Sequence, residues 1–286
     1  MSNQERKIAD ARGKFAQVVR DGKKLNDVSW TGGRILLSTM RVVLAGNGGK
    51  RTIPLSDVHA VGGRYDVNQD IARVSDYVSL VMGNDVVLVS GGDEGFETDV
   101  YRALLDREVV FVRHPAVEGG VVQDTEWEKA QLQLEDGALN VATAGGSFVA
   151  LDLDDIGTVE TNERTVNDEK RQVIEAEHTE EGTSVETYFS GTDRHTAIVE
   201  SLLRRGEQQS ATGVELDEAE REVLMALYSG VSSFELPEFL GMEVERVEEI
   251  LDRLVELEVI EEVRTRREVA LNARGRNLAS EAMNEQ

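Results

Sequence analysis

The segments IPLSDVHAV, at residues 53–61, and ALDLDDIGTV, at residues 150–159, decide the fold, because they are two copies of one pattern. Four positions of the first segment return in the second, each 98 residues later: Leu55, Asp57, Val58 and Val61 correspond to Leu153, Asp155, Ile156 and Val159. Farther along the chain, Leu104 and Leu105 return as Leu202 and Leu203 with the same offset. A period of this length is too long for a solenoid repeat and indicates two similar domains.

Around these two segments, both copies keep the same landmarks in the same order. These are a Trp (Trp30, Trp127), a Gly-Gly turn (Gly48-Gly49, Gly145-Gly146) and a Ser-Gly pair (Ser90-Gly91, Ser190-Gly191). In the first copy, the patterning predicts strands near 34–38, 41–45, 51–55, 58–62, 77–82 and 85–90, followed by a helix near 95–106. Asn47-Gly48 and Asp136-Gly137 predict hairpin turns, since these residues tolerate a positive φ.

We therefore predict an α+β protein with two tandem pleckstrin-homology-like domains, at residues 1–114 and 115–209. Each is a bent β-sheet capped by one C-terminal amphipathic helix. Such a fold assigns no function by itself. Lipid-headgroup binding in particular requires a cluster of Lys and Arg, and neither copy shows a convincing one.

Residues 210–286 have a different pattern, which predicts a winged helix-turn-helix domain. Asp217 and Glu220 predict a capping box at the start of a first helix, with Val223, Leu224, Leu227 and Tyr228 as its apolar side. Ser232 and Glu235 predict a second capping box, before a helix that buries Leu236, Phe239 and Leu240 and ends at Gly241. A third helix carries Val244, Val247, Leu251 and Leu254. The segments EVIEEV and EVALN then predict a two-stranded wing around Arg264–Arg267, and ARGRNLASEA a closing helix.

The charge of the 286-residue chain is strongly negative and unevenly distributed. It has 55 acidic and 31 basic residues, a net charge of −24, and only 7 of its basic residues are Lys. This balance favours the cytoplasm of a halophilic archaeon over an ordinary acidic protein, because concentrated salt screens the repulsion. Residues 1–114 carry a net charge of +1, residues 115–211 of −14 and residues 212–286 of −11. A near-neutral surface can be buried without desolvating many carboxylates, so we expect the first domain to provide a protein contact.

The same charge argues against DNA binding by the predicted winged helix. From Glu243 to Glu258, the third helix has seven carboxylates against Arg246 and Arg253, a net charge of −5. DNA presents a dense negative charge, and phosphate neutralisation supplies most non-specific affinity. We therefore expect a protein-binding module. A transcription regulator with β-rich sensory domains, and a peripheral membrane protein that uses the pleckstrin-like folds, remain the competing classes.

Residues that carry catalysis or bind cofactors are not evident. The chain has no Cys, which removes disulfides and thiolate sites. Its four His lie in separate segments without metal-ligand spacing, so we expect turn or surface residues and neither metal nor cofactor. No apolar run is long enough to span a bilayer and the N-terminus lacks a signal-peptide stretch, so we expect a cytoplasmic protein without membrane insertion. No nucleophile–base pair stands out, and we expect no enzyme.

Together with the C-terminal pattern, three segments resemble the archaeal CheF taxis proteins over essentially the full length: WTGGRILLSTMRVVLAGNG, IPLSDVHAVGGRYD and VRHPAVEGGVV. The resemblance implies an adaptor between phosphorylated CheY and the cytoplasmic switch proteins of the archaellum, of the ArlC, ArlD and ArlE type. On this basis we expect a homodimer that is recruited to the cytoplasmic face of the motor and binds no nucleic acid. The near-neutral first domain is the expected surface for self-association or for docking to the motor.

We predict that the C-terminal domain binds CheY, because it is a small module behind a polar linker. The candidate contact residues are two aromatic and three basic ones: Phe234, Phe239, Arg264, Arg266 and Arg267. Arginines can meet acidic groups on CheY, and aromatic side chains supply burial at interface centres. The alternative is that both Phe side chains belong to the core and that the wing is merely solvated.

Overall fold

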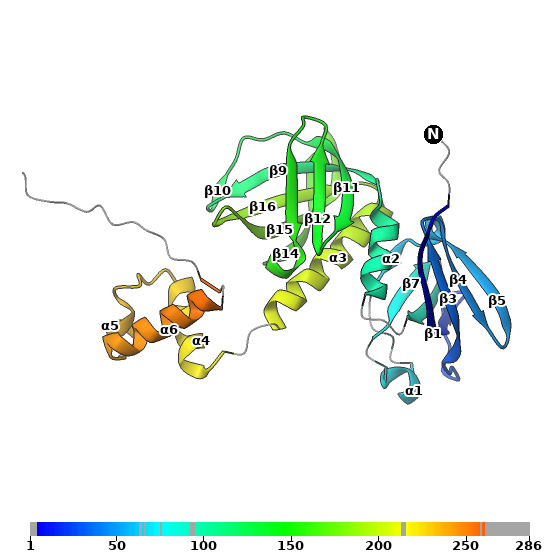
Figure 1. Ribbon diagram of the computed structural model, residues 1–286. Helices are drawn as coiled ribbons and strands as arrows, with labels where there is room; N and C mark the ends of the chain where they lie inside the picture. Colours follow the sequence, from blue (N-terminus) through cyan, green and yellow to red (C-terminus); the bar gives the residue numbers. More distant parts are fainter. Residues whose placement is uncertain are drawn as a thin grey trace, which may run out of the picture. The chain divides into compact units, whose positions relative to one another are not determined.

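The computed structural model describes residues 5–62, 65, 67–74, 76–91, 95–212, 216–257 and 259–260 (Figure 1). The chain divides into two compact units, Met1–Val214 and Glu215–Gln286. The first contains two antiparallel sheets, each followed by a helix, and the second contains helices, so the protein is an α+β protein. The wing and the closing helix expected after residue 258 lie outside the described residues, apart from 259 and 260.

The first sheet has the strand order β5-β4-β3-β1-β8-β7-β6, with β2 paired to β1. Its strands are β1 (Lys7–Arg20), β2 (Lys23–Lys24), β3 (Thr31–Ser38), β4 (Arg41–Gly46), β5 (Gly49–Pro54), β6 (Ala60–Val61), β7 (Val78–Met82) and β8 (Asp85–Ser90). A short 3-10 turn, η1 (Leu55–Asp57), and the helix α1 (Gln69–Ala72) lie between strands, and α2 (Phe96–Leu105) follows the last one.

The second sheet repeats this order as β13-β12-β11-β9-β16-β15-β14, with β10 paired to β9. Its strands are β9 (Val109–Glu118), β10 (Val121–Val122), β11 (Glu128–Glu135), β12 (Ala138–Thr143), β13 (Phe148–Asp152), β14 (Val159–Val166), β15 (Glu169–Glu180) and β16 (Thr183–Ser190). The turn η2 (Leu153–Asp155) and the helix α3 (Asp193–Thr212) follow the same plan. The identical topology confirms the duplication.

The hairpin turns agree with the sequence, and the sheets extend farther than it indicated. A two-residue turn at Asn47-Gly48 joins β4 to β5, and Asp136-Gly137, with φ of 51° and 81°, joins β11 to β12. The long strand β1, which pairs with both β3 and β8, was not predicted. The predicted boundary between residues 114 and 115 falls within β9, whose residues pair with β11 and β16.

One hydrophobic core runs through both copies, because α2 and α3 lie between the two sheets (Figure 1). Polar contacts join the copies across this core. The hydroxyls of Tyr101 and Ser201 are 2.7 Å apart, and Ser201 also donates to the carbonyl of Val61. Arg194 donates from Nε to the carbonyl of Val58 at 2.9 Å and pairs with Glu108 at 3.1 Å. The two copies are therefore one packed body.

The second unit contains α4 (Glu218–Tyr228), α5 (Leu236–Leu240) and α6 (Val244–Glu256) around a small core. The capping box of Asp217 and Glu220 is confirmed, and Gly241 ends α5 with a φ of 66°. The second capping box is wrong: Glu235 precedes α5, and no side chain caps its first turn. Ser232 contributes its carbonyl to the amide of Glu235, so a turn occupies the place of the expected helix start.

Candidate functional site

The two aromatic residues predicted to contact a partner are exposed. Phe234 is 79 % exposed in the turn before α5, and Phe239 is 63 % exposed on that helix. Phe239 was expected on the buried side of its helix, and this is wrong. Because α5 has only five residues, it anchors to the core through Leu236, which is fully buried, and its other side remains accessible.

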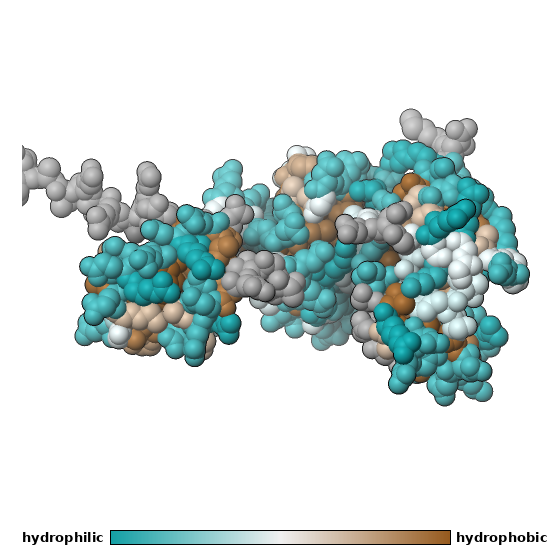
Figure 2. All heavy atoms as spheres, turned by 60° about the horizontal axis from the view of Figure 1, so that its bottom comes forward, coloured by the Kyte–Doolittle hydropathy of each residue, from teal (hydrophilic) through white to brown (hydrophobic). Residues whose placement is uncertain are grey.

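Two residues of α4 extend this exposed apolar set, which we define as Met225, Tyr228, Phe234 and Phe239. Met225 is 70 % exposed and Tyr228 is 96 % exposed, although Tyr228 was expected in the core. Figure 2 shows apolar side chains at the surface of this unit. The core uses Val223 and Ala226 instead, each two residues before one of these positions and therefore on the opposite side of the helix. Single exposed apolar residues are common, and these four large ones are the candidate contact residues that this unit offers to a partner.

The surface of α6 is acidic, and both of its arginines are engaged within the unit. Arg246 pairs with Asp217 at 3.6 Å and with Glu249 at 3.2 Å, and Arg253 pairs with Glu220 at 3.0 Å. These arginines therefore hold α6 to the start of α4 and are occupied by carboxylates. The three candidate arginines of the wing, Arg264, Arg266 and Arg267, lie outside the described residues.

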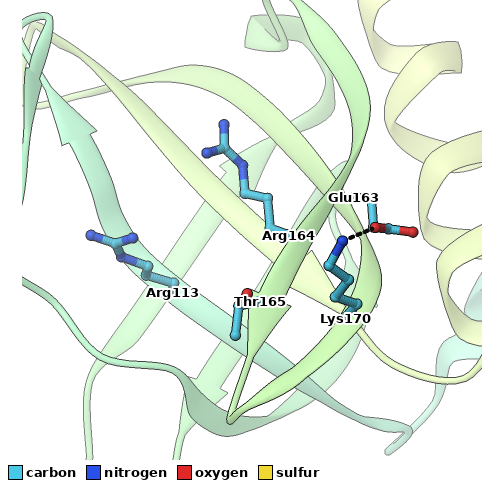
Figure 3. A pocket seen from close by; sticks show the side chains of 5 residues that line it. All are labelled: Arg113, Glu163, Arg164, Thr165 and Lys170. Atoms are coloured by element: carbon cyan, nitrogen blue, oxygen red, sulfur yellow. Dashed lines mark ion pairs between the residues drawn. The ribbon is translucent and has the colours of Figure 1, made fainter.

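The second sheet carries a basic hollow of about 350 Å³, which the sequence did not indicate. It is lined by Arg113 of β9 and by four residues of the β14–β15 hairpin: Glu163, Arg164, Thr165 and Lys170 (Figure 3). Lys170 pairs with Glu163 at 3.2 Å. Arg113 donates to the hydroxyl of Thr125 and to the carbonyl of Gln123, and no described carboxylate lies within ion-pair distance of it.

Arg164 is held by a buried carboxylate on the neighbouring strand. Its Nε and Nη2 donate to Oε1 and Oε2 of Glu175 at 2.5 and 2.6 Å, and its guanidinium lies 4.9 Å from the ring centre of Tyr188. Burial raises the pKa of Glu175, but hydrogen bonds from Arg164 and Asn162 outweigh it, so that this pKa lies below its usual value. The hollow therefore contains mostly neutralised cations, with Arg113 as the exception.

Two histidines form a buried polar pair, which contradicts the expectation that all four are turn or surface residues. The rings of His114 and His178 stack with centroids 6.0 Å apart, and both contact the hydroxyl of Thr187. His178 is 3 % exposed. Burial lowers the pKa of both rings below the usual value, although Glu180, 3.1 Å from His114, acts in the opposite direction. Both are therefore neutral at physiological pH.

The described residues contain no group of three His, Asp or Glu side chains suited to holding a metal ion. No described helix is both long and apolar enough to cross a membrane. The described features of the two units are an exposed apolar set, an acidic helix surface, a basic hollow and a pair of histidines.

Comparison with known proteins agrees with this character. Residues 7–209 match the family described as archaeal chemotaxis signal transduction system protein F, and residues 215–284 match a domain family of unknown function. The chain is 54 % identical over 291 residues to taxis protein CheF1 of Halobacterium salinarum, with both chains covered completely. It is 29 % identical over 266 residues to taxis protein CheF2 of the same organism, and this match covers 87 % of this chain and 89 % of that relative.

Proposed function

Because this chain belongs to the archaeal CheF family of taxis signal-transduction proteins, we propose that it is a non-enzymatic adaptor between phosphorylated CheY and the archaellum. In this role it binds the phosphorylated response regulator at one surface and the cytoplasmic switch proteins of the motor at another, and thereby changes the rotation of the filament. It acts in the cytoplasm, as a homodimer at the motor.

The observation that carries this proposal is the exposed apolar set of the C-terminal unit. A protein that carries a signal between two partners needs surfaces that can be buried, and aromatic side chains dominate the centres of such interfaces. We interpret the two sheets as pleckstrin-homology-like domains and the C-terminal unit as a winged helix. Both folds serve here as scaffolds for protein contacts.

The competing function, transcription regulation, has little support on the surface that would contact DNA. The exposed side of α6 is acidic, and its two arginines are paired with Asp217, Glu220 and Glu249. Phosphate contacts require free cations. A winged helix with this third helix is better suited to a protein partner.

The test is binding of purified, phosphorylated CheY to the full chain in molar KCl. Phe234→Ser combined with Phe239→Ser removes two exposed aromatic rings without opening the core. We expect the affinity for CheY to fall at least about tenfold, because truncating an interface hot-spot residue costs roughly 2 kcal/mol or more of binding free energy. Phe148→Ser is the matched control, because Phe148 is 67 % exposed on β13 in the other unit. Unchanged CheY binding by the double variant would refute the assignment of the surface.

A further inference from the structure

The outer face of the first sheet presents a row of cations, in a chain whose net charge is −24. The sequence showed no convincing cluster of Lys and Arg in this copy, because these residues come from separate strands that only the sheet brings together. The register places Arg12 of β1 opposite Arg34 of β3, Arg34 opposite Ala45 of β4, and Ala45 opposite Lys50 of β5. Directly paired residues point to the same side of a sheet. Lys14, two residues beyond Arg12, shares this side. We define these four residues, Arg12, Lys14, Arg34 and Lys50, as the cationic face (β1, β3, β4 and β5 in Figure 1).

Most of this positive charge is not neutralised within the protein. Asp10 accepts two hydrogen bonds of 2.7 Å from Arg34 and lies 3.5 Å from Lys7. Lys14 lies 5.4 Å from the ring centre of Trp30, and Arg12 and Lys50 are exposed. Among the described residues, no carboxylate pairs with Arg12, Lys14 or Lys50. This contrasts with the hollow in the second sheet, where Arg164 and Lys170 each have an acidic partner.

The fold does not require these cations, as the second copy shows. The equivalent row in the second sheet runs from Val109 through Gln131 and Ala142 to Phe148. The four equivalent positions of the second sheet therefore hold uncharged residues, although the strand order is the same. Moreover, like charges directly opposite each other on neighbouring strands are destabilising, as Arg12 and Arg34 are. A feature that is dispensable for the fold and unfavourable for stability indicates a binding role.

We propose that the cationic face is a docking surface for a carboxylate-rich protein. Two acidic proteins repel each other unless at least one presents a patch of opposite sign, and electrostatic complementarity then fixes their orientation. Arginine also forms bidentate hydrogen bonds with carboxylates, which act at contact distance and persist where salt screens longer-range forces. Nucleic acid is the competing polyanionic ligand, and the experiment below includes it as a probe.

Within the proposed function, on which this identification of the partner rests, the ligand is an acidic face of an archaellum switch protein. The cationic face and the exposed apolar set lie in different units of the chain. The adaptor would thus bind its two partners through different chemistry, carboxylate recognition in the first unit and apolar burial in the second.

The experiment measures binding of the full chain to four probes: a polyglutamate peptide, a DNA duplex, purified switch proteins and phosphorylated CheY. The test variant is Arg12→Glu combined with Lys50→Glu. The matched control is Lys23→Glu combined with Lys24→Glu, which reverses two exposed cations of the same sheet and changes the net charge equally. A second variant, Arg12→Gln combined with Lys50→Gln, removes the two positive charges without reversing them. It tests the proposal if the charge-reversed variant fails to fold, and thermal unfolding is measured for each variant to establish this.

We expect the reversal to weaken binding of polyglutamate and of the switch proteins at least tenfold, and the glutamine variant to weaken it less. The control variant and CheY binding should remain unchanged. The proposal is overturned if the control loses as much affinity as the test variant, or if DNA binds more tightly than polyglutamate and loses affinity with the reversal. If the wild-type chain binds polyglutamate through this face but neither CheY nor the switch proteins, the adaptor function fails while the surface stands.

Discussion

Replacing Arg164 with leucine isolates a buried ion pair whose contribution can be worked out from the structure. The Glu175 side chain is only 9 % exposed, and it accepts two hydrogen bonds from Arg164 and one of 3.1 Å from Asn162. Removing one partner of a fully buried pair costs about 3–5 kcal/mol. Arg164 is 46 % exposed, so screening reduces this figure. We expect Arg164→Leu to lower the free energy of unfolding by about 2–3 kcal/mol at neutral pH.

The double variant Arg164→Leu with Glu175→Leu should recover most of that loss, because replacing both members of a buried pair with apolar groups is often close to neutral. Arg171→Leu is the matched control. Arg171 lies directly opposite Arg164 on β15. Its ion pair among the described residues is with Glu169, which is 67 % exposed, and its guanidinium lies 5.5 Å from the ring centre of Phe111, so its loss should cost less than about 1 kcal/mol.

The contribution of Glu175 to the free energy of unfolding depends on pH with a defined sign. In the wild type the pKa of Glu175 is lowered, so its contribution to stability is complete above the unfolded-state pKa and is lost as the pH falls through the folded-state value. Without Arg164, the largest cause that lowers this pKa is gone, and burial raises the pKa relative to the wild type although the hydrogen bond from Asn162 remains. The penalty of the variant is then present at neutral pH and is relieved as acid protonates the carboxyl group.

The assay is chemical denaturation in molar KCl, followed by circular dichroism and by tryptophan fluorescence, since Trp127 packs beside Tyr188 on this side of the sheet. Measuring the free energy of unfolding at neutral pH and at about pH 5 tests this pH dependence. A loss below about 0.5 kcal/mol for Arg164→Leu, or a coupling energy near zero in the double-mutant cycle, would refute the reasoning.

Three further changes have defined outcomes. Gly13→Ala should destabilise the first unit by about 3 kcal/mol in the same denaturation assay, because a Cβ there would lie 2.1 Å from the carbonyl oxygen of Ser90; Gly32→Ala, with open space around it, should be nearly neutral. Asp217→Ala removes the capping box of α4 and should cost the C-terminal unit about 1 kcal/mol, visible as a lower midpoint in its denaturation. Burial raises the pKa of Tyr101 and of Tyr188 to about 12, so in an ultraviolet titration Tyr101→Phe should leave the number of phenols that ionise near pH 10 unchanged and remove one that ionises near pH 12.

The sequence predicted the features that depend on local chemistry. The hairpin turns, the capping box of α4 and the stop at Gly241 each follow from the conformational preference of one or two residues. The duplication was also visible, because corresponding core positions recur at one offset and produce the same strand order in both sheets.

What the sequence did not predict depends on contacts between distant segments. In the strand β1, the burial of successive residues does not alternate regularly, because it pairs with β3 along its first part and with β8 along its last part. Tyr228 and Phe239 fit apolar stripes by spacing, yet both are exposed: Tyr228 is the last residue of α4, and Phe239 lies on the five-residue helix α5. The neighbours of Arg164 come from three strands, so neither the buried pair with Glu175 nor the hollow was visible in the linear pattern.

The duplication provides an internal comparison that separates what the fold needs from what function adds. The two sheets have the same strand order, the same short turn before their last three strands and the same closing helix, so these features are needed to bury the common core. One pairing row differs in chemistry: Arg12, Arg34 and Lys50 in the first sheet correspond to Val109, Gln131 and Phe148 in the second. Val109 and Phe148 are 51 % and 67 % exposed, which shows that neither version of the row is required by core packing. Divergence in a solvent-facing row of a shared scaffold is the expected result when each copy acquires its own partner.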